Sequence, residues 1–266
     1  KLLAEPHDLS PSAITSRLST QWLGQTLHYF PVISSTQTEA HRLAQEGAPS
    51  GTVVVADQQE KGKGRFGRFW HSPPHTGLWF SFILRPTLPL HAMPQLTLLT
   101  AVAVLKGIKK VIDVPLTIKW PNDLLIDGKK VAGILTELKA ETDQVHYVVI
   151  GIGINVNQRS EDFPEELRHL ATSLAIAAGR PLPRKEVIIQ VLNTWEAIYS
   201  QYRQEGFQPI KRDWEAYSST LGKRITAQTT EGYVTGTAKG IDQDGALEVE
   251  DAQGRIHKIY SANIES

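Results

Sequence analysis

The sequence predicts an α+β protein with two domains, a larger domain of strands and helices over residues 1–219 and a small antiparallel β-barrel over residues 220–266. Segments with strand and helix patterns follow one another through the larger part. Near the boundary the pattern changes to short β-rich pieces, separated by the turn dipeptides Glu231-Gly232, Asp244-Gly245 and Gln253-Gly254. Turn residues at this spacing are typical of a small barrel.

The first elements carry local signals. Pro11 opens a short helix predicted over residues 12–23, because proline is tolerated in the first turn of a helix. The run T36-Q-T-E39 has the spacing of a capping box, and Gly47 closes the helix that follows it. The apolar runs T52-V-V-V-A56 and L78-W-F-S-F-I-L84 predict two buried strands.

The middle of the chain predicts a helix, a strand and a hairpin. Residues 95–112 carry apolar side chains at helical spacing, which indicates a helix against a sheet. A strand is predicted over residues 116–120. Asp127-Gly128 lies between two apolar runs within residues 124–135, and this is a strong β-hairpin signal. Residues 146–155 predict a further buried strand.

Three helices are predicted after that strand, over residues 164–178, 184–205 and 209–219. Gly179 and Gly206 end the first two, as glycine commonly does after the last helical residue. The second helix has one continuous apolar stripe, which we interpret as a core-facing surface.

Composition narrows the classes of protein. The 28 Lys and Arg residues balance 28 Asp and Glu residues, whereas a protein that grips long nucleic acids usually has a basic excess. The absence of cysteine excludes disulfides, thiolate metal sites and cysteine nucleophiles, and it fits a cytoplasmic location.

The sequence has no sign of a membrane or secretory segment. No apolar run reaches the ~18 residues that span a bilayer, and the start has no secretory signal. Because the sequence starts at Lys1 and its one methionine is Met93, we expect that a segment precedes it.

The most unusual stretch is Q59-E-K-G-K-G-R-F-G-R-F-W70, where three glycines alternate with four cations. Glycine lets backbone N–H groups approach an anion closely, so the stretch predicts a loop around a small anionic ligand. A solvated basic loop is the alternative. Residues 62–67 match G-x-G-x-x-G, but Pro73 and Pro74 exclude the helix that a dinucleotide site needs. One charge pair contributes roughly 4 kcal/mol at ~4 Å and an effective dielectric of ~20. A triphosphate carries several charges and is well hydrated, so one lysine would not hold it, whereas several cations together could.

Two further motifs could belong to the same site. K119-W-P-N-D123 places Asn122 and Asp123 at a turn after a strand. K129-K-V-A-G133 places Lys130 in a strand with apolar neighbours. By spacing alone, the first could be a plain turn and the second a solvated edge lysine. H71-S-P-P-H75 could be a metal pair, but its prolines prevent a shared helical face, so we expect no metal site there.

Together these motifs resemble those of one family. They occur in the order found in biotin protein ligases: S35-T-Q37, Q59 to R68, W70, K119-W-P-N-D123, K130-V-A-G133 and G151-I-G-I-N155. The resemblance covers nearly the whole chain. It implies a mixed β-sheet with helices on one side, as in class II aminoacyl-tRNA synthetases, followed by an SH3-like barrel.

The family's activity implies two steps. Biotin and ATP with Mg²⁺ form biotinyl-5′-AMP, which then passes biotin to one lysine of a biotin carboxyl carrier protein of acetyl-CoA carboxylase or a similar biotin-dependent carboxylase. The resemblance implies catalytic roles for Lys130, Arg65 and Asp123. A fixed cation at Lys130 would offset the repulsion between a carboxylate and a phosphate. Asp123 would take a proton from the acceptor lysine.

The resemblance also implies two sets of binding residues. Biotin would be bound by Ser35, Thr36, Gln37, Gln59, Gly62, Lys63, Arg65, Ser81, Lys130 and Gly133. ATP and the adenylate would be bound by Gly64, Arg65, Arg68, Trp70, Lys130 and Asn155. Lys63 stands where arginine is usual, and Phe66 often has a basic counterpart. These departures weaken the expected phosphate contact, since lysine cannot bind bidentately.

Other readings stay open. A lipoate or octanoate ligase of the related fold is the nearest alternative. A biotin-responsive transcriptional repressor is another, and K1-L-L-A-E-P6 resembles the end of the DNA-binding domain in ligase/repressors, but operator DNA binding is expected only of a longer form. An RNA-binding module is disfavoured by the balanced charge. The family has monomers and homodimers, and the sequence leaves the oligomeric state open.

Overall fold

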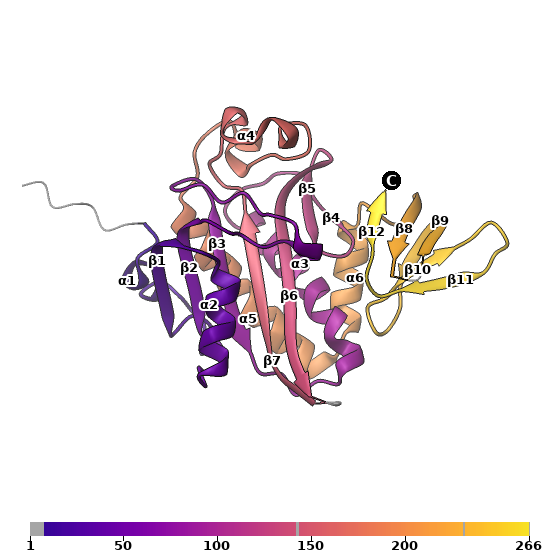
Figure 1. The fold of residues 1–266 in the computed structure, drawn as a ribbon, viewed down its shortest axis with the longest axis horizontal. Helices are drawn as coiled ribbons and strands as arrows, with labels where there is room; N and C mark the ends of the chain where they lie inside the picture. Colours follow the sequence, from indigo (N-terminus) through magenta and orange to yellow (C-terminus); the bar gives the residue numbers. More distant parts are fainter. Residues whose placement is uncertain (1–7, 142–143, 231, 266) are drawn as a thin grey trace, which may run out of the picture.

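The computed structural model describes residues 8–141, 144–230 and 232–265, so the run K1-L-L-A-E-P6 lies outside the described residues. A seven-stranded sheet is the centre of the larger part of the molecule (Figure 1). β1 and β2 run parallel, and the other neighbouring strands run antiparallel, which confirms the expected mixed sheet. The strands in spatial order are β1 (Leu27–Ile33), β2 (Val53–Gln59), β3 (Leu78–Leu84), β7 (Gln144–Ile154), β6 (Lys129–Glu141), β5 (Asp123–Ile126) and β4 (Leu116–Lys119).

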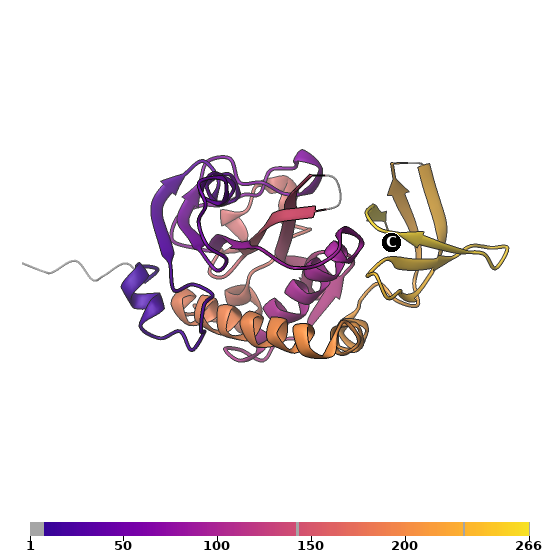
Figure 2. The ribbon, with the colours of Figure 1, turned by 90° about the horizontal axis from the view of Figure 1, so that it is seen from below.

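Helices lie on both faces of this sheet (Figure 2). They are α1 (Pro11–Thr15), α2 (Thr36–Gln45), α3 (Met93–Lys109), α4 (Leu174–Ala178), α5 (Arg184–Glu205) and α6 (Gln208–Tyr217). Short 3-10 turns are η1 (Arg65–Gly67), η2 (Leu90–Ala92), η3 (Ser160–Asp162) and η4 (Glu165–Leu167).

The two faces of the sheet have separate apolar clusters. Strand residues such as Val53 and Phe82 join α3 and α5 in the main core. Alternate residues such as Val54 and Ile83 pack against Ala40 of α2. Because successive side chains on a strand point to opposite faces, a strand that is apolar throughout needs cover on both. Because α2 covers the face opposite to α3 and α5, the expectation that all helices lie on one side of the sheet is wrong.

Several predicted elements are confirmed. The strand over residues 78–84 and the helix over 184–205 have the predicted bounds. The hairpin turns at Asp127 and Gly128, whose φ angles of 49° and 78° place both in the left-handed region of a tight hairpin turn. The cap of α2 is shifted by one residue from the predicted box, since the Ser35 hydroxyl accepts a hydrogen bond from the Thr38 amide at 3.5 Å.

The helix predicted over residues 12–23 is wrong beyond Thr15. The amides of Gln21, Trp22 and Leu23 donate to the Glu196 carboxylate of α5 at 2.6, 3.1 and 2.8 Å. These tertiary hydrogen bonds replace the ones a helix would make.

The helix predicted over residues 164–178 is also mostly wrong, since only Leu174–Ala178 is α-helical. The backbone before it pairs with β6, where the Lys130 amide donates to the Leu170 carbonyl at 2.8 Å and Thr172 donates back at 2.9 Å. Ser173 then caps α4. Strand β1 was not predicted, because Pro31 breaks its pattern; proline is tolerated in an edge strand.

A second, five-stranded antiparallel sheet follows α6 and is consistent with an SH3-like domain. We call it the C-terminal sheet. Its strands in spatial order are β11 (Ile256–Ile259), β10 (Leu247–Glu250), β9 (Gly232–Ile241), β8 (Arg224–Thr229) and β12 (Asn263–Glu265). The predicted turns at Asp244-Gly245 and Gln253-Gly254 lie between strands, while Glu231 lies outside the described residues. None of the helices in the described ranges combines the length and the hydrophobicity that a membrane span requires.

Candidate active site

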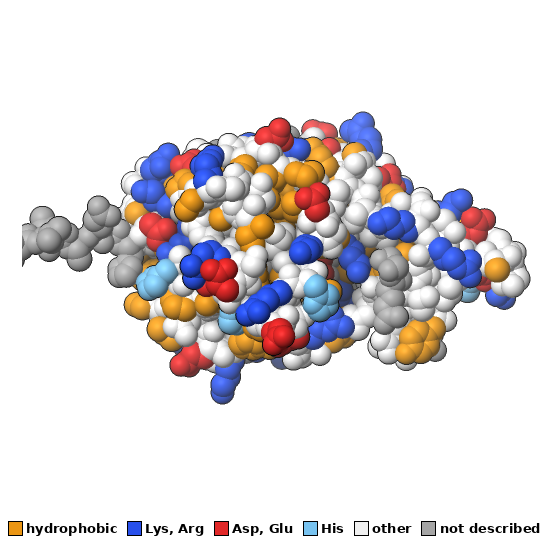
Figure 3. Space-filling view, turned by 90° about the horizontal axis from the view of Figure 1, so that it is seen from above, with side chains coloured by type: hydrophobic (Ala, Val, Ile, Leu, Met, Phe, Trp, Pro, Cys, Tyr) orange, Lys and Arg blue, Asp and Glu red, His pale blue; other side chains and the backbone are white. Residues whose placement is uncertain are grey.

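A cavity of about 340 Å³ lies against the large sheet beside the start of α2. This volume suits a small-molecule ligand. On the face seen in Figure 3, Lys and Arg side chains are interspersed with Asp and Glu side chains. The lining comes from the start of α2, from strands β3, β4, β5, β6 and β7, from the turn between β4 and β5, and from the segments 59–71, 163–171 and 262–264. We call residues 59–70 the basic loop.

Buried polar side chains form one end of the cavity. The Thr36 amide and hydroxyl donate to Gln59 Oε1 at 2.9 and 3.1 Å. The Thr36 and Ser81 hydroxyls lie 2.9 Å apart, and Ser81 donates to Gln37 Oε1 at 3.0 Å. All four side chains are buried, so the network is shielded from bulk water. Such a network can read the hydrogen-bonding pattern of a polar ligand head group.

The floor beside this network is made of glycines. A Cβ on Gly153 would lie 2.6 Å from the Trp70 ring, and one on Gly133 would lie 2.8 Å from it. The Trp70 indole can therefore lie flat against β6 and β7 only because both positions lack a side chain. Trp79 supports Trp70 from behind by an edge-on contact, with ring centroids 6.5 Å apart.

The basic loop folds back on itself above the cavity. The Gly64 amide donates to the Arg68 carbonyl at 2.8 Å, and the Trp70 amide donates to the Gly62 carbonyl at 2.9 Å. A Cβ on Gly62 would lie 2.4 Å from the Trp70 carbonyl oxygen, so only glycine fits there. Phe66 at the tip has φ 57°, an uncommon conformation for a bulky residue.

Arg65 ties the loop to two distant parts of the chain. Its guanidinium donates to Asn122 Oδ1 at 3.0 Å and to Ser261 Oγ at 2.9 Å, next to the C-terminal strand β12. Burial lowers the pKa of Arg65, and the negative charge of Asp123 opposes that shift. The loop is thereby fastened to the large sheet and to the C-terminal sheet at once.

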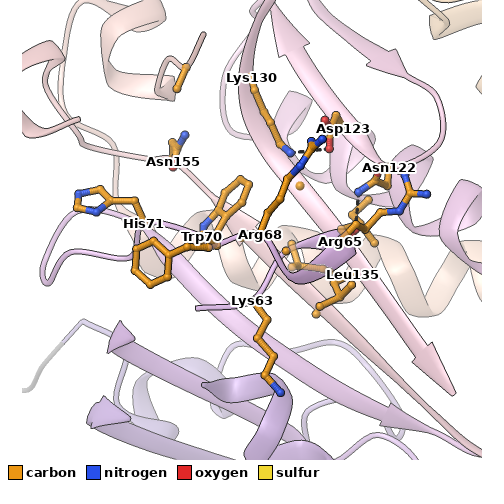
Figure 4. A pocket seen from close by; sticks show the side chains of 18 of the residues that line it. Lys63, Arg65, Arg68, Trp70, His71, Asn122, Asp123, Lys130, Leu135 and Asn155 are labelled. Atoms are coloured by element: carbon orange, nitrogen blue, oxygen red, sulfur yellow. Dashed lines mark hydrogen bonds and ion pairs between the residues drawn. The ribbon is translucent and has the colours of Figure 1, made fainter. Parts of the chain in front are cut away.

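A cluster of charges lies at the other end of the cavity (Figure 4). Lys130 Nζ forms an ion pair with Asp123 Oδ1 at 2.7 Å, and it lies 5.0 Å from the Trp70 ring centroid. The Arg68 side chain reaches towards this pair, whereas Lys63 points away from it. Two cations beside one carboxylate can accept a further anion such as a phosphate.

Asn155 is buried at the end of β7, with both ends of its amide already bonded. It donates to the Thr172 carbonyl at 3.1 Å and accepts from Gln158 at 3.1 Å. Asn155 therefore fixes the position of Thr172, which directly follows the cavity-lining segment 163–171.

The structure brings almost all the predicted site residues to this one cavity. The lining contains Ser35, Thr36, Gln37, Gln59, Lys63, Gly64, Arg65, Arg68, Trp70, Ser81, Asp123, Lys130, Gly133 and Asn155. Gly62 is outside the lining, although it belongs to the basic loop and packs against the Trp70 carbonyl.

Sequence reasoning missed three contributors to the cavity. Asn122 was read as a turn residue, yet its amide also donates to the Ile134 carbonyl at 2.8 Å and so links Arg65 to β6. The sequence predicts a helix over residues 164–178, and this prediction hides the contribution of segment 163–171 to the lining. Residues 262–264 carry no signal in the sequence. The motif K119-W-P-N-D123 is the signal that marks Asn122, because it places Asn122 directly before Asp123.

Comparison with known proteins supports the family that the sequence motifs indicate. The Biotin/lipoate A/B protein ligase family model matches residues 29–155, and the model of the biotin protein ligase C terminal domain matches residues 220–265. The chain is 52% identical over 265 residues to the bifunctional ligase/repressor BirA of Bacillus spizizenii, covering 100% of this chain and 81% of that protein. The chain belongs to the biotin protein ligase family. It is also 34% identical to the biotin–[acetyl-CoA-carboxylase] ligase of Mycobacterium tuberculosis, covering 86% of this chain and 85% of that one.

A solved structure of this ligase family has the same fold. The biotin protein ligase from Aquifex aeolicus in complex with biotin and ATP superposes with a TM-score of 0.76 at 34% identity. The match covers 91% of this chain and 98% of that chain, so it includes both sheets.

We expect the basic loop of this ligase to become more protected when ligands bind. Its four cations repel one another, and an anion would relieve that repulsion and add hydrogen bonds. Amide hydrogen exchange over residues 60–69, with and without biotin and ATP, measures the change. The hairpin turn at Asp127-Gly128, outside the cavity, is the internal control. Equal exchange of the loop in both states would contradict the prediction.

Proposed function

We propose that this chain activates biotin with MgATP to biotinyl-5′-AMP and transfers biotin to one lysine of a biotin carboxyl carrier protein. The observation that carries the proposal is the layout of the cavity. A buried network of neutral polar groups lies at one end, and the Lys130–Asp123 ion pair with Arg68 lies at the other. Biotin has the matching layout, with a polar ureido group at one end and a carboxylate at the other.

The head group of biotin would bind at the start of α2. Thr36, Gln59 and Ser81 offer hydroxyl and amide groups within one buried network, and the buried Ser35 hydroxyl precedes Thr36 at the cap of α2. Gly133 and Gly153 leave room for the apolar part of the ligand and for the Trp70 ring on the same stretch of sheet. Burial of these groups would exclude water from the ligand and strengthen each hydrogen bond.

The first chemical step would take place beside Lys130. An oxygen of the biotin carboxylate attacks the α-phosphorus of ATP, the bond to the bridging oxygen breaks, and pyrophosphate leaves. Both reactants are anionic, so a cation between them lowers the cost of bringing them together. Lys130 and Arg68 are placed for this, and Trp70 would pack against the adenylate while Arg65 and Asn122 keep the loop closed.

The second step needs a neutral acceptor lysine. Its nitrogen attacks the acyl carbon of biotinyl-5′-AMP, AMP leaves, and one proton must be removed from the nitrogen. Asp123 is the one carboxylate in the cavity lining formed by the described residues. It would accept this proton once the phosphate engages Lys130 and loosens the ion pair.

Magnesium would arrive as part of the nucleotide substrate. Mg²⁺ is usually held by substrate phosphates with one or two carboxylates and retains several waters. Within the described ranges, no group of three or more His, Cys, Asp or Glu side chains could hold a metal ion by itself. The single carboxylate of Asp123 fits a metal held mainly by ATP.

The decisive experiment offers the chain biotin, MgATP and a biotin carrier domain, and uses mass spectrometry to detect the modified lysine. Lipoate and octanoate are offered in parallel, because the matching family model covers both kinds of ligase. We expect adenylate formation and a biotinylated carrier with biotin only. Activation of lipoate in preference to biotin would overturn the proposal.

We further propose that residues 1–219 form the catalytic domain and residues 220–266 an SH3-like domain that completes the site. Ser261 and residues 262–264 support this, since they touch the loop and line the cavity. A homodimer is compatible with this arrangement, because the cavity is lined from within one chain.

We predict that residues 1–266 do not bind a biotin-operon operator, although similar proteins are named ligase/repressors. Specific DNA binding needs a recognition element in a groove and several phosphate contacts. The chain has zero formal net charge, and its basic loop is folded over the cavity. Titration against an operator fragment with biotin and ATP present is the test. Tight, sequence-specific binding at physiological salt would show that a DNA-reading element lies within this chain.

A further inference from the structure

Glu137 lies on β6 beside the polar end of the cavity but does not line it. One of its oxygens, Oε2, accepts from Gln37 Nε2 at 2.9 Å and lies 3.2 Å from His41 Nε2. The His41 hydrogen bond lowers the pKa of Glu137, burial opposes the shift, and Gln37 lowers the pKa further. The carboxylate is therefore ionised at neutral pH, and an ionised carboxylate only accepts hydrogen bonds.

This fixes the orientation of the Gln37 amide. Its nitrogen faces two groups that can only accept, Glu137 and the Val149 carbonyl at 3.2 Å, so the Gln37 oxygen must face Ser81. Gly151 makes room for this orientation, since a Cβ there would lie 2.4 Å from Gln37 Oε1.

The amide orientation in turn fixes the hydroxyl protons. Ser81 has one proton and donates it to Gln37 Oε1. Thr36 has one proton, and both Ser81 Oγ and Gln59 Oε1 are acceptors within reach. Gln59 is itself oriented by the Thr36 amide, which must donate to its oxygen. Both hydroxyl protons are thus used within the protein, and only lone pairs remain for a ligand.

We propose that Glu137 is a positioning residue that makes Ser81 and Thr36 act as acceptors only, so that this end of the cavity selects a ligand head group with N–H donors. The inference rests on the proposed function, since the ureido group of biotin has two N–H donors. Beyond the proposed function, the inference assigns the preference for N–H donors to the Glu137 carboxylate, which does not itself touch the ligand. Without Glu137, only the longer bond to the Val149 carbonyl holds the Gln37 nitrogen in place, so the Gln37 amide can turn over more readily and Ser81 is then free to donate.

The test compares biotin with two analogues, in each of which one ureido N–H is replaced by oxygen. Dissociation constants are measured by calorimetry for the full chain and for Glu137→Met, which keeps the side-chain length but removes the acceptor. In the parent we expect at least one analogue to bind about tenfold more weakly than biotin, because its oxygen faces an acceptor. In Glu137→Met we expect biotin to bind about tenfold more weakly and the analogue penalty to fall to about threefold or less.

Two control variants separate polarity from packing. Glu137→Gln should behave as the parent, because the two donors of Gln37 and His41 converge on one oxygen and select the amide oxygen of the new side chain. His41→Phe removes a neighbour of Glu137 but leaves Gln37 in place, so it should keep the parent's discrimination. Glu137→Ala replaces Glu137→Met if thermal unfolding shows that the methionine variant is not folded.

The outcomes distinguish the two proposals. If the parent does not bind biotin, the proposed function fails, and this inference fails with it. If the parent binds biotin but the folded acceptor-free variants discriminate against the analogues as strongly as the parent, the role of Glu137 is overturned while the proposed function stands.

Discussion

Replacing Lys130 with alanine is expected to lower the rate of adenylate formation by about 10³-fold or more. Lys130 Nζ is held 2.7 Å from Asp123 and 5.0 Å from the Trp70 ring, so it is a fixed cation in the cavity. A fixed charge at the meeting point of two anions stabilises the transition state more than the separated reactants. Pyrophosphate release with biotin and MgATP measures the effect.

The fold should survive this change. The backbone of Lys130 keeps its hydrogen bonds to Leu170 and Thr172, and its side chain is 33% exposed. Lys129 is a matched control, because it lies on the same hairpin and is exposed to solvent. We expect Lys129→Ala to keep the parent rate within about twofold. Pyrophosphate release by Lys130→Ala within a few-fold of the parent would show that the assigned role is wrong.

Replacing Arg65 with glycine is expected to speed the dissociation of biotinyl-5′-AMP by about tenfold or more and to weaken biotin binding. The change removes hydrogen bonds to Asn122 and Ser261, each contributing about 1 kcal/mol or more. The loop would lose its attachment to both sheets. Released adenylate would then modify lysines on unrelated proteins. Rapid mixing followed by separation of bound from free adenylate measures the rate.

Ser261→Ala is the matched control for this prediction. It removes only the contact with the C-terminal sheet and leaves the charge of Arg65 and its bond to Asn122. We expect a smaller increase in the dissociation rate, about two- to fivefold. If adenylate leaves the Arg65→Gly variant as slowly as it leaves the parent, the loop does not retain this intermediate.

The sequence alone was enough for the elements with strong local signals. Asp127-Gly128 predicts its turn because both residues must adopt positive φ, and the apolar stripe ended by Gly206 predicts α5. The motifs were also enough to identify the family. In each case the information lies in the residue pattern and in the order of motifs along the chain, so no distant contact is needed to interpret it.

The tertiary structure decided everything that depends on which strand lies beside which. Spacing left Lys130 as either a pocket residue or a solvated edge residue, because alternation gives a strand two faces without saying which one faces a cavity. The pairing of residues 170–172 with Lys130 overrode a helical pattern. Gln37 meets Glu137 across 100 positions of sequence, and Arg65 meets Ser261 across 196. Such contacts form only when the sheet order is set by burial of both its faces, and that burial is a property of the whole chain.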